Sequence, residues 1–289
     1  MQPLRELRAE DADAVARLFF EAFGDDRRLD AEEIRTWLAN EELRDEWLRV
    51  LEVDGRVVGY GDIYVHPDRV QLDVAAPGHW EAFLGWAETE AAERGVEVQV
   101  YFPAGHALEA TVAQRGYRLA RSSYTMEIDL PQTLQQPALP DGITLRAYRD
   151  GDEEPLRAAL NEAFVDDWHF HAVDRANFRE FYLKARGFDP GLWLLADDEG
   201  EIAGFALAYP DHVGEEGLGW VGTLGVRAPW RRRGLGEALL RAAFVELHRR
   251  GRRRVGLGVD AENVTGALRL YERVGMHVVR RGDNWIREK

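Results

Sequence analysis

The sequence contains no cysteine, no long apolar run and fewer basic than acidic residues. Without cysteine, the chain can form no disulfide, thiolate zinc site or iron–sulfur cluster, and no thiol nucleophile is available. No stretch approaches about 18 consecutive apolar residues, and the N-terminus has no apolar signal core. We therefore expect a cytoplasmic protein without a membrane span. The net charge of −15 argues against duplex nucleic acid as a partner.

The charge is unevenly distributed along the 289 residues. Residues 1–141 carry 14 basic and 28 acidic side chains, a net of −14, and residues 142–226 carry 7 and 17, a net of −10. Residues 227–254 contain ten arginines and two glutamates, a net of +8. This basic segment is either a solvated helix face or an anion site. Its glycines favour the anion site, because they let backbone N–H groups approach a ligand closely.

The chain repeats itself. Segments of the first half recur 141 residues later: Leu4-Arg5 as Leu145-Arg146, Asp11 as Asp152, and Glu21-Ala22-Phe23 as Glu162-Ala163-Phe164. The offset grows further along the chain, so the second copy contains insertions. Two copies of this length indicate a domain duplication rather than a solenoid of short repeats. We predict a first domain at residues 1–130, a linker rich in proline and glutamine at 131–142, and a second domain at 143–289.

Apolar periodicity in the second copy predicts a mixed α/β fold. Strands are expected at residues 143–146, 192–196, 202–209, 220–226, 255–259 and around 278–286. Helices are expected at 152–164, 235–247 and 264–274. Asp152 is a candidate helix cap, and Gly251 is a candidate stop signal.

The basic segment holds a turn between a strand and a helix. Gly234 and Gly236 stand where the helix is expected to begin, directly after Arg231-Arg232-Arg233. Backbone N–H groups at a helix start lack partners within the helix and bind phosphate well. The third glycine of a dinucleotide-binding loop is absent, as is the Gly-Lys-Ser/Thr of a P-loop. A pyrophosphate in another type of ligand is the favoured interpretation.

The pattern Arg231-x-x-Gly234-x-Gly236 resembles the acetyl-CoA signature of the GNAT superfamily of N-acyltransferases. Asn263, Tyr271 and Gly275 resemble a second motif of that family in spacing and order, with Met276 in place of the usual phenylalanine. The resemblance implies two tandem GNAT-like acyl-CoA N-acyltransferase domains, each an α/β (α+β) fold with a mixed sheet. This arrangement is similar to that of the mycothiol synthases, a two-domain branch of the superfamily with a catalytic C-terminal half.

The resemblance also implies roles for individual residues. The loop would hold the CoA pyrophosphate through Arg231, Arg232, Arg233, Gly234, Leu235 and Gly236. Leu224, Gly225 and Val226 would pair with the pantetheine arm, and Asn263 would bond to it. Tyr271 would protonate the leaving thiolate, since a phenol can donate to a thiolate at neutral pH. Alternatives are a helix-cap role for Asn263 and a core role for Tyr271.

The general base and the acceptor site are less well defined in the sequence. Trp220 stands where many family members carry a carboxylate, and Glu216 lies just upstream. Glu216 is a candidate for the acceptor site, with a solvated loop position as the alternative. Trp168, His169 and Phe170 lie where family members place residues that cover the substrate. No metal is expected, because the pair His169 and His171 has no third ligand nearby.

The first copy lacks the loop. Its corresponding turn, Ala75–His79, is short and has one glycine and no arginine, and no tyrosine matches Tyr271. We expect a degenerate domain that packs against the second copy as an internal pseudo-dimer in a monomeric protein. Its negative charge would favour a cationic substrate, with a role in solubility as the alternative.

These observations predict an acetyl-CoA-dependent N-acetyltransferase acting on a primary amine of a small molecule or peptide. Transfer would be direct, in a ternary complex, with acetyl-CoA as co-substrate. Neither nucleic acid nor membrane is expected as a partner. The alternative is a non-catalytic acyl-CoA-binding sensor or scaffold, which the missing strand carboxylate leaves open.

Overall fold

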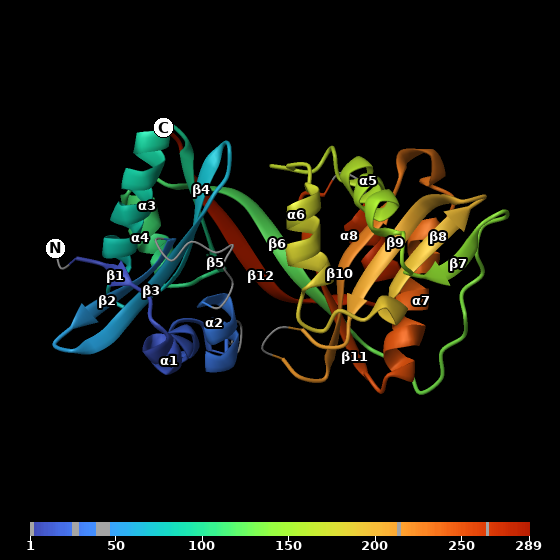
Figure 1. Ribbon diagram of the computed structural model, residues 1–289, viewed down its shortest axis with the longest axis horizontal. Coiled ribbons are helices and arrows are strands. Elements are labelled where there is room, and N and C mark those ends of the chain that lie inside the picture. The colour runs from blue at the N-terminus through green and yellow to red at the C-terminus, as the bar shows by residue number, and fades with distance from the viewer. Residues whose placement is uncertain (1–2, 25–28, 39–46, 213–214, 264–265) are drawn as a thin grey trace. The chain divides into compact units, whose positions relative to one another are not determined.

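The computed structural model describes residues 3–24, 29–38, 47–212, 215–263 and 266–289, and it contains two compact units. Unit 1 is formed by residues 1–124, 260–262 and 280–289, and unit 2 by residues 125–259 and 263–279. Each unit is a mixed sheet with helices packed on it (Figure 1). The mixed α/β prediction is confirmed. No helix in the described ranges is both long and apolar enough to cross a membrane.

Unit 1 has the sheet order β1-β2-β3-β4-β5-β12. Its strands are β1 (Arg5–Glu6), β2 (Leu48–Val53), β3 (Arg56–Val65), β4 (Arg69–Ala75), β5 (Glu97–Pro103) and part of β12 (His277–Arg287). Its helices are α1 (Ala12–Phe23), α2 (Ala31–Leu38), α3 (Trp80–Arg94) and α4 (Leu108–Gln114). Strands β4 and β5 are parallel, whereas β2–β3, β3–β4 and β5–β12 are antiparallel.

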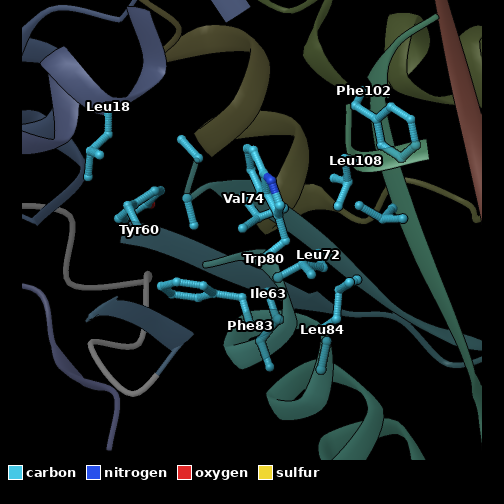
Figure 2. Packing of buried hydrophobic residues seen from close by; sticks show 14 of the residues in the cluster. Leu18, Tyr60, Ile63, Leu72, Val74, Trp80, Phe83, Leu84, Phe102 and Leu108 are labelled. Carbon is cyan, nitrogen blue, oxygen red and sulfur yellow. The ribbon is translucent and has the colours of Figure 1, made fainter. Parts of the chain in front are cut away.

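The core of unit 1 lies between its sheet and its helices (Figure 2). Helix α1 buries Val15, Leu18 and Phe19 at the three- and four-residue spacing of one helix face. Figure 2 shows Leu18 near Tyr60 of β3, and Phe83 and Leu84 of α3 in the same cluster. Burial of these apolar side chains is the main stabilising contribution to the unit.

Unit 2 has the sheet order β6-β11-β10-β9-β8-β7. Its strands are β7 (Thr144–Ala147), β8 (Trp193–Asp198), β9 (Glu201–Tyr209), β10 (Leu218–Val226), β11 (Arg254–Asp260) and part of β6 (Arg118–Asp129). Its helices are α5 (Glu153–Ala163), α6 (Arg175–Phe178), α7 (Leu235–Arg249) and α8 (Ala267–Arg273), with a π-helical turn at Arg179–Leu183. The expected strands and helices of this copy are present, although α8 begins at Ala267, and residues 264–265 lie outside the described residues.

The two faces of the unit 2 sheet are distinguished by alternation along β9. A side chain at Gly204 would meet Leu239 of α7, so this residue faces α7. Phe205 and Leu207 point to the other face, where they pack in the cluster that contains Leu156 of α5. Because side chains of a strand alternate between faces, α5 and α7 cover opposite sides of the sheet.

The repeated sequence corresponds to a repeated ion pair. The two guanidinium Nη atoms of Arg5 bind the carboxylate of Asp11 at 2.7 and 2.8 Å, and those of Arg146 bind Asp152 at 2.6 and 2.9 Å. In both copies the same carboxylate accepts a backbone N–H, from Arg8 and Arg149 respectively. Asp152 does stand at the N-cap of α5, but its carboxylate forms no cap bond to the helix. The expected capping interaction is therefore replaced by the arginine pair.

The last strand of each copy ends in the other unit. Residues 282–287 of β12 pair with β5 in unit 1, where the Trp285 ring stacks on Phe102 with 6.2 Å between centroids. Residues 125–129 of β6 belong to unit 2, where Leu130 N–H donates to the carbonyl of Arg253 at 2.7 Å. The units are thus not two consecutive pieces of the chain. The domain limits expected at residues 130 and 143 stay a prediction.

Candidate functional site

The ladder between β10 and β11 is short. These parallel strands pair only from Leu218 to Trp220 against Arg254 to Gly256, and no further pairs occur among the described residues of the two strands. On its other side β10 pairs with β9 from Trp220 to Val226, with a bulge between Val221 and Thr223. The bulged residue is Gly222, where a Cβ would lie 2.7 Å from the ring of Tyr209. Beyond the bulge, β10 therefore has a backbone edge available for an extended partner.

The loop that joins β10 to α7 is anchored at several points. The Arg227 guanidinium binds Glu162 at 2.7 Å and lies over the Trp230 ring, and the Trp230 indole N–H donates to Asp198 at 2.6 Å. The Arg231 side chain donates to the carbonyls of Val226 and Ala163, at 2.9 Å each. The charge of Arg231 thus holds the loop in shape. This use of its side chain was not anticipated from the signature alone.

The start of α7 presents free backbone donors. Arg232 and Gly234 have φ of +61° and +82°, and the left-handed conformation at Gly234 turns the chain into the helix. The first helical bond is from Ala238 N–H to the Gly234 carbonyl. Within the described part of the chain, the N–H groups of residues 234–237 have no acceptor. Free donors at the positive end of a helix dipole favour a bound anion.

Most arginines of the basic segment are neutralised, but those of the loop are not. Six of the ten have carboxylate partners: Arg227 with Glu162 and Glu201, Arg241 with Glu237, Arg249 with Glu246, Arg250 with Glu246 and Asp189, Arg252 with Asp211, and Arg254 with Glu127 and Glu215. Among the residues described, no carboxylate pairs with Arg231, Arg232 or Arg233, while Arg253 contacts His248. The uncompensated charge of the segment therefore gathers at the loop, as an anion site requires.

Tyr271 is buried in α8, and Asn263 lies between β11 and that helix. Burial, followed by the negative charge of Asp167, raises the pKa of Tyr271 to about 12. The phenol therefore stays protonated at neutral pH and is available as a proton donor. The N-cap residue of α8 is Gly266 rather than Asn263. The side chain of Asn263 is half-buried at the end of β11.

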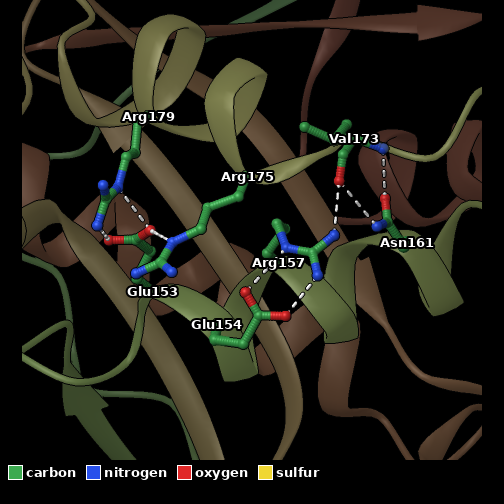
Figure 3. Close-up of polar contacts among 7 residues, drawn as sticks. All are labelled: Glu153, Glu154, Arg157, Asn161, Val173, Arg175 and Arg179. Atoms are coloured by element: carbon green, nitrogen blue, oxygen red, sulfur yellow. Dashed lines mark hydrogen bonds and ion pairs between the residues drawn. The ribbon is translucent and has the colours of Figure 1, made fainter.

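The segment with Trp168, His169 and Phe170 follows α5 and is fixed at both ends. At its start, Asp167 N–H donates to the Phe164 carbonyl. At its end, Figure 3 shows Asn161 of α5 exchanging two hydrogen bonds with the backbone of Val173, at 2.8 and 3.1 Å. Arg157 donates to the same carbonyl at 2.8 Å (Figure 3). The segment is thereby held beside α5, with its three candidate side chains half-buried.

A second group of side chains surrounds Trp220. Its indole lies over β11, since a Cβ at Gly256 would come within 2.8 Å of the ring. The imidazole of His212 stacks on the same indole, with centroids 3.9 Å apart. Glu216 lies in an exposed turn before β10, at the opposite end of the strand from the glycine loop. The alternation of glycine with apolar residues in β11 was the sequence signal for a large ring packed on this strand, and sequence analysis missed it.

The corresponding place in unit 1 is closed. Only four residues, 76–79, separate β4 from α3, against eight between β10 and α7. Trp80 is the first residue of α3, and its ring meets His106 edge-on at 5.3 Å. The His106 ring also lies between Phe23 and Phe102, and its Nδ1 accepts the N–H of Leu108. Aromatic side chains thus occupy this region of the first copy.

Comparison with known proteins identifies the family. The family model described as Acetyltransferase (GNAT) family matches residues 154–276. A mycothiol acetyltransferase of Streptomyces coelicolor is 30% identical over 294 residues, covering 95% of this chain and 91% of the relative. The chain belongs to the GNAT acetyltransferase family. This confirms the prediction made from the glycine loop and the second motif.

Further relatives support the family and its tandem form. A mycothiol acetyltransferase of Salinispora arenicola is 36% identical over 174 residues, and that match covers 57% of this chain and about half, 55%, of the relative. A GCN5-related N-acetyltransferase structure from Sphaerobacter thermophilus has a TM-score of 0.80 at 33% identity, covering 99% of this chain and 95% of that one. A tandem GNAT protein from the clavulanic acid pathway has a TM-score of 0.68 at 16% identity, covering 99% and 98%. The last shows the tandem fold alone.

Proposed function

We propose that the protein is an acetyl-CoA-dependent N-acetyltransferase that acetylates a primary amine, with the second copy as the catalytic domain. The observation that carries the proposal is the coincidence of three features of the loop between β10 and α7. Counted over the described residues, they are four free N–H donors, three arginines without carboxylate partners, and a strand edge that is unpaired beyond Trp220. A pyrophosphate on an extended amide-containing arm matches all three.

In this proposal each part of the loop has a distinct task. The N–H groups of residues 234–237 hold the pyrophosphate, and Arg232 and Arg233 add charge. Arg231 keeps the loop in shape through its bonds to Val226 and Ala163. The backbone of Leu224, Gly225 and Val226 pairs with the pantetheine amides, and Asn263 adds a bond to the same arm. The arm then directs the thioester along β10 toward the bulge.

Tyr271 is proposed as the acid of the reaction. Amine attack forms a C–N bond at the acetyl carbon and breaks the C–S bond, leaving a thiolate that needs a proton. A neutral phenol beside it can supply that proton, and its raised pKa keeps it neutral over the whole physiological range. The half-buried Trp168, His169 and Phe170, and the exposed Glu216, remain candidates for acceptor contacts.

The acceptor is proposed to be a small-molecule amine. Relatives named mycothiol acetyltransferase make deacetylated mycothiol the first acceptor to try. Cationic amines and peptide N-termini complete the panel, because the chain carries a large negative charge.

The test combines CoA binding with thiol release. We expect calorimetry to detect CoA binding to the wild type, and Arg232→Gln with Arg233→Gln to weaken it about tenfold. Arg249→Gln is the matched control, because that arginine is already paired with Glu246 and should change affinity less than about twofold. Thiol release from acetyl-CoA in the presence of the amine panel then measures transfer. Binding of CoA without transfer to any amine would favour an acyl-CoA sensor, and failure to bind CoA would exclude both functions.

A further inference from the structure

The short ladder between β10 and β11 fixes where an acceptor amine must be placed. The free edge of β10 runs from Val221 to Val226, six residues or about 20 Å of extended chain. An arm that starts at the glycine loop can follow this edge only as far as the junction at Trp220 and Gly256, where the two strands begin to pair. A thioester at the end of the arm therefore lies near that junction, and the attacking amine must lie beside it.

The side chain of Glu127 lies at this junction. The Cγ atom of Glu127, on β6, is 3.4 Å from the position that a Cβ of Gly256 would take. The Trp220 ring lies 2.8 Å from the same position, so the two side chains meet over β11. Gly219 faces Leu247 of α7, and Trp220, as its neighbour, faces the opposite side of the sheet. Glu127 and Trp220 thus share the face that α5 covers.

The surroundings of Glu127 are charged on several sides. Its carboxylate lies 3.5 Å from the Arg254 Nε atom, and Arg254 also pairs with Glu215. The imidazole of His212, on the segment before β10, stacks on the indole of Trp220. Glu127 therefore lies beside a guanidinium, with an imidazole nearby. Only 12% of the Glu127 side chain is exposed to solvent. A partly buried carboxylate attracts a cation more strongly than an exposed one does.

We propose that Glu127 takes the proton from the acceptor's ammonium group. Glu127 thereby replaces the carboxylate that many family members carry at the strand position of Trp220. The inference rests on the proposed N-acetyltransferase function. The ammonium gives one proton to Glu127, the neutral nitrogen attacks the acetyl carbon, and the C–S bond breaks. Sulfur receives its proton from Tyr271, and the second proton of the nitrogen restores the phenol. The net products are an amide, free CoA thiol and one proton, which Glu127 releases to solvent.

This assignment gives the first copy a part in the reaction. Glu127 is encoded in the first copy, and it reaches the unit 2 sheet because β6 ends there. The Trp220 indole packs on Gly256 and takes the place of the strand carboxylate. Strand β6 supplies a carboxylate instead, that of Glu127. A degenerate first copy that binds no CoA would then still contribute one side chain to the acceptor site.

The test compares Glu127→Gln with Glu215→Gln in acetylation of the best amine from the panel. Both variants remove one carboxylate from Arg254, so both lose a similar ion pair. We expect Glu127→Gln to lower kcat/KM for the amine about 100-fold at pH 7. The deficit should shrink as the pH rises toward the pKa of the amine, because the neutral amine needs no base. Glu215→Gln should stay within about threefold of the wild type at every pH, and both variants should keep the KM for acetyl-CoA.

Each result decides the inference. Equal effects of the two variants, or a Glu127→Gln deficit that does not change with pH, would show that the carboxylate only supports Arg254, and would leave the N-acetyltransferase function intact. Absence of transfer by the wild type would overturn that function and this inference with it. If Glu127→Gln fails to fold, Glu127→Asp serves instead. It should keep the pH profile of the wild type at a lower rate, and a changed profile would count against the inference.

Discussion

Both units contain a mixed sheet with helices, but they differ at the turn that leads from a strand into a helix. In unit 2, eight residues join β10 to α7, β10 carries a bulge, and the helix begins with free N–H groups. In unit 1, four residues join β4 to α3, the register of β3 with β4 has no bulge, and Trp80 fills the region with aromatic neighbours. The ion pairs of Arg5 and Arg146 are alike in both.

The difference narrows the proposed cofactor site to particular features of unit 2. The parallel ladder is short in both units, since β4 and β5 pair over only four residues, from Arg69 to Leu72. Separated strands therefore do not distinguish the two units. What unit 1 lacks is the longer loop, its glycines and its unpaired arginines, and aromatic packing takes their place.

The largest effect is expected from making unit 2 resemble unit 1 at the second position of the helix. That position is Gly236 in α7 and Glu81 in α3. Gly236→Glu would place a carboxylate among the N–H groups that are to hold a pyrophosphate, and CoA affinity measured by calorimetry should fall at least about 1000-fold. Gly236→Ala is the control, because its Cβ would meet a Leu270 methyl at 3.3 Å and a Val226 methyl at 3.7 Å. Equal losses for the two variants would point to a steric cause.

A change in β12 should affect the stability of unit 1 although the residue belongs to the second copy. Trp285 is buried against Phe102, and Trp285→Ala should lower the free energy of unfolding by about 3 kcal/mol. The loss should be seen in chemical denaturation, with CoA affinity of the folded protein unchanged. Val278→Ala, at an exposed position of the same strand, should cost less than about 0.5 kcal/mol. Weakened CoA binding in the tryptophan variant would contradict this assignment to unit 1.

Tyr271 has no counterpart in the first copy, so its removal should affect catalysis alone. Tyr271→Phe should lower kcat about 100-fold while CoA affinity stays within about twofold. Because the pKa of Tyr271 is raised to about 12, its acid form persists far above neutral pH, and the wild type should show no loss of this acid between pH 7 and 10. Unchanged turnover in the phenylalanine variant would remove Tyr271 from the mechanism.

The smallest effects are expected from the ion pair that both units share. Its loss should lower the stability of the two units equally. Burial tends to raise the pKa of Asp11 and Asp152, but bonds from the paired arginine and a backbone N–H lower it overall. Their contribution to stability is therefore present above the ordinary pKa and lost as pH falls through the lowered one. Asp11→Asn and Asp152→Asn should each cost about 2 kcal/mol at pH 7 and little in acid. Glu10→Gln, an exposed control, should have almost no effect.

The sequence allowed the local features of the site to be predicted, because they depend on residues close together in the chain. The apolar stripe of α7, the glycines before it and the short turn at Ala75–His79 all belong to this class. The use of Arg231 as a brace for the loop could not be predicted, since its acceptors at Val226 and Ala163 are backbone carbonyls, which carry no sequence signal. The position of Glu127 beside Trp220 depends on strand order, which periodicity does not encode.

The exchange of strand ends has a consequence for biosynthesis. Domains usually fold in the order in which the ribosome produces them. Here β5 must wait for residues 282–287, which are made after all of residues 125–279. At ordinary translation rates of about 5–20 residues per second, this delay is roughly 10–30 s. During that interval the nascent first unit has an exposed strand edge, which is a site for unwanted strand pairing, and an unfilled place beside Phe102.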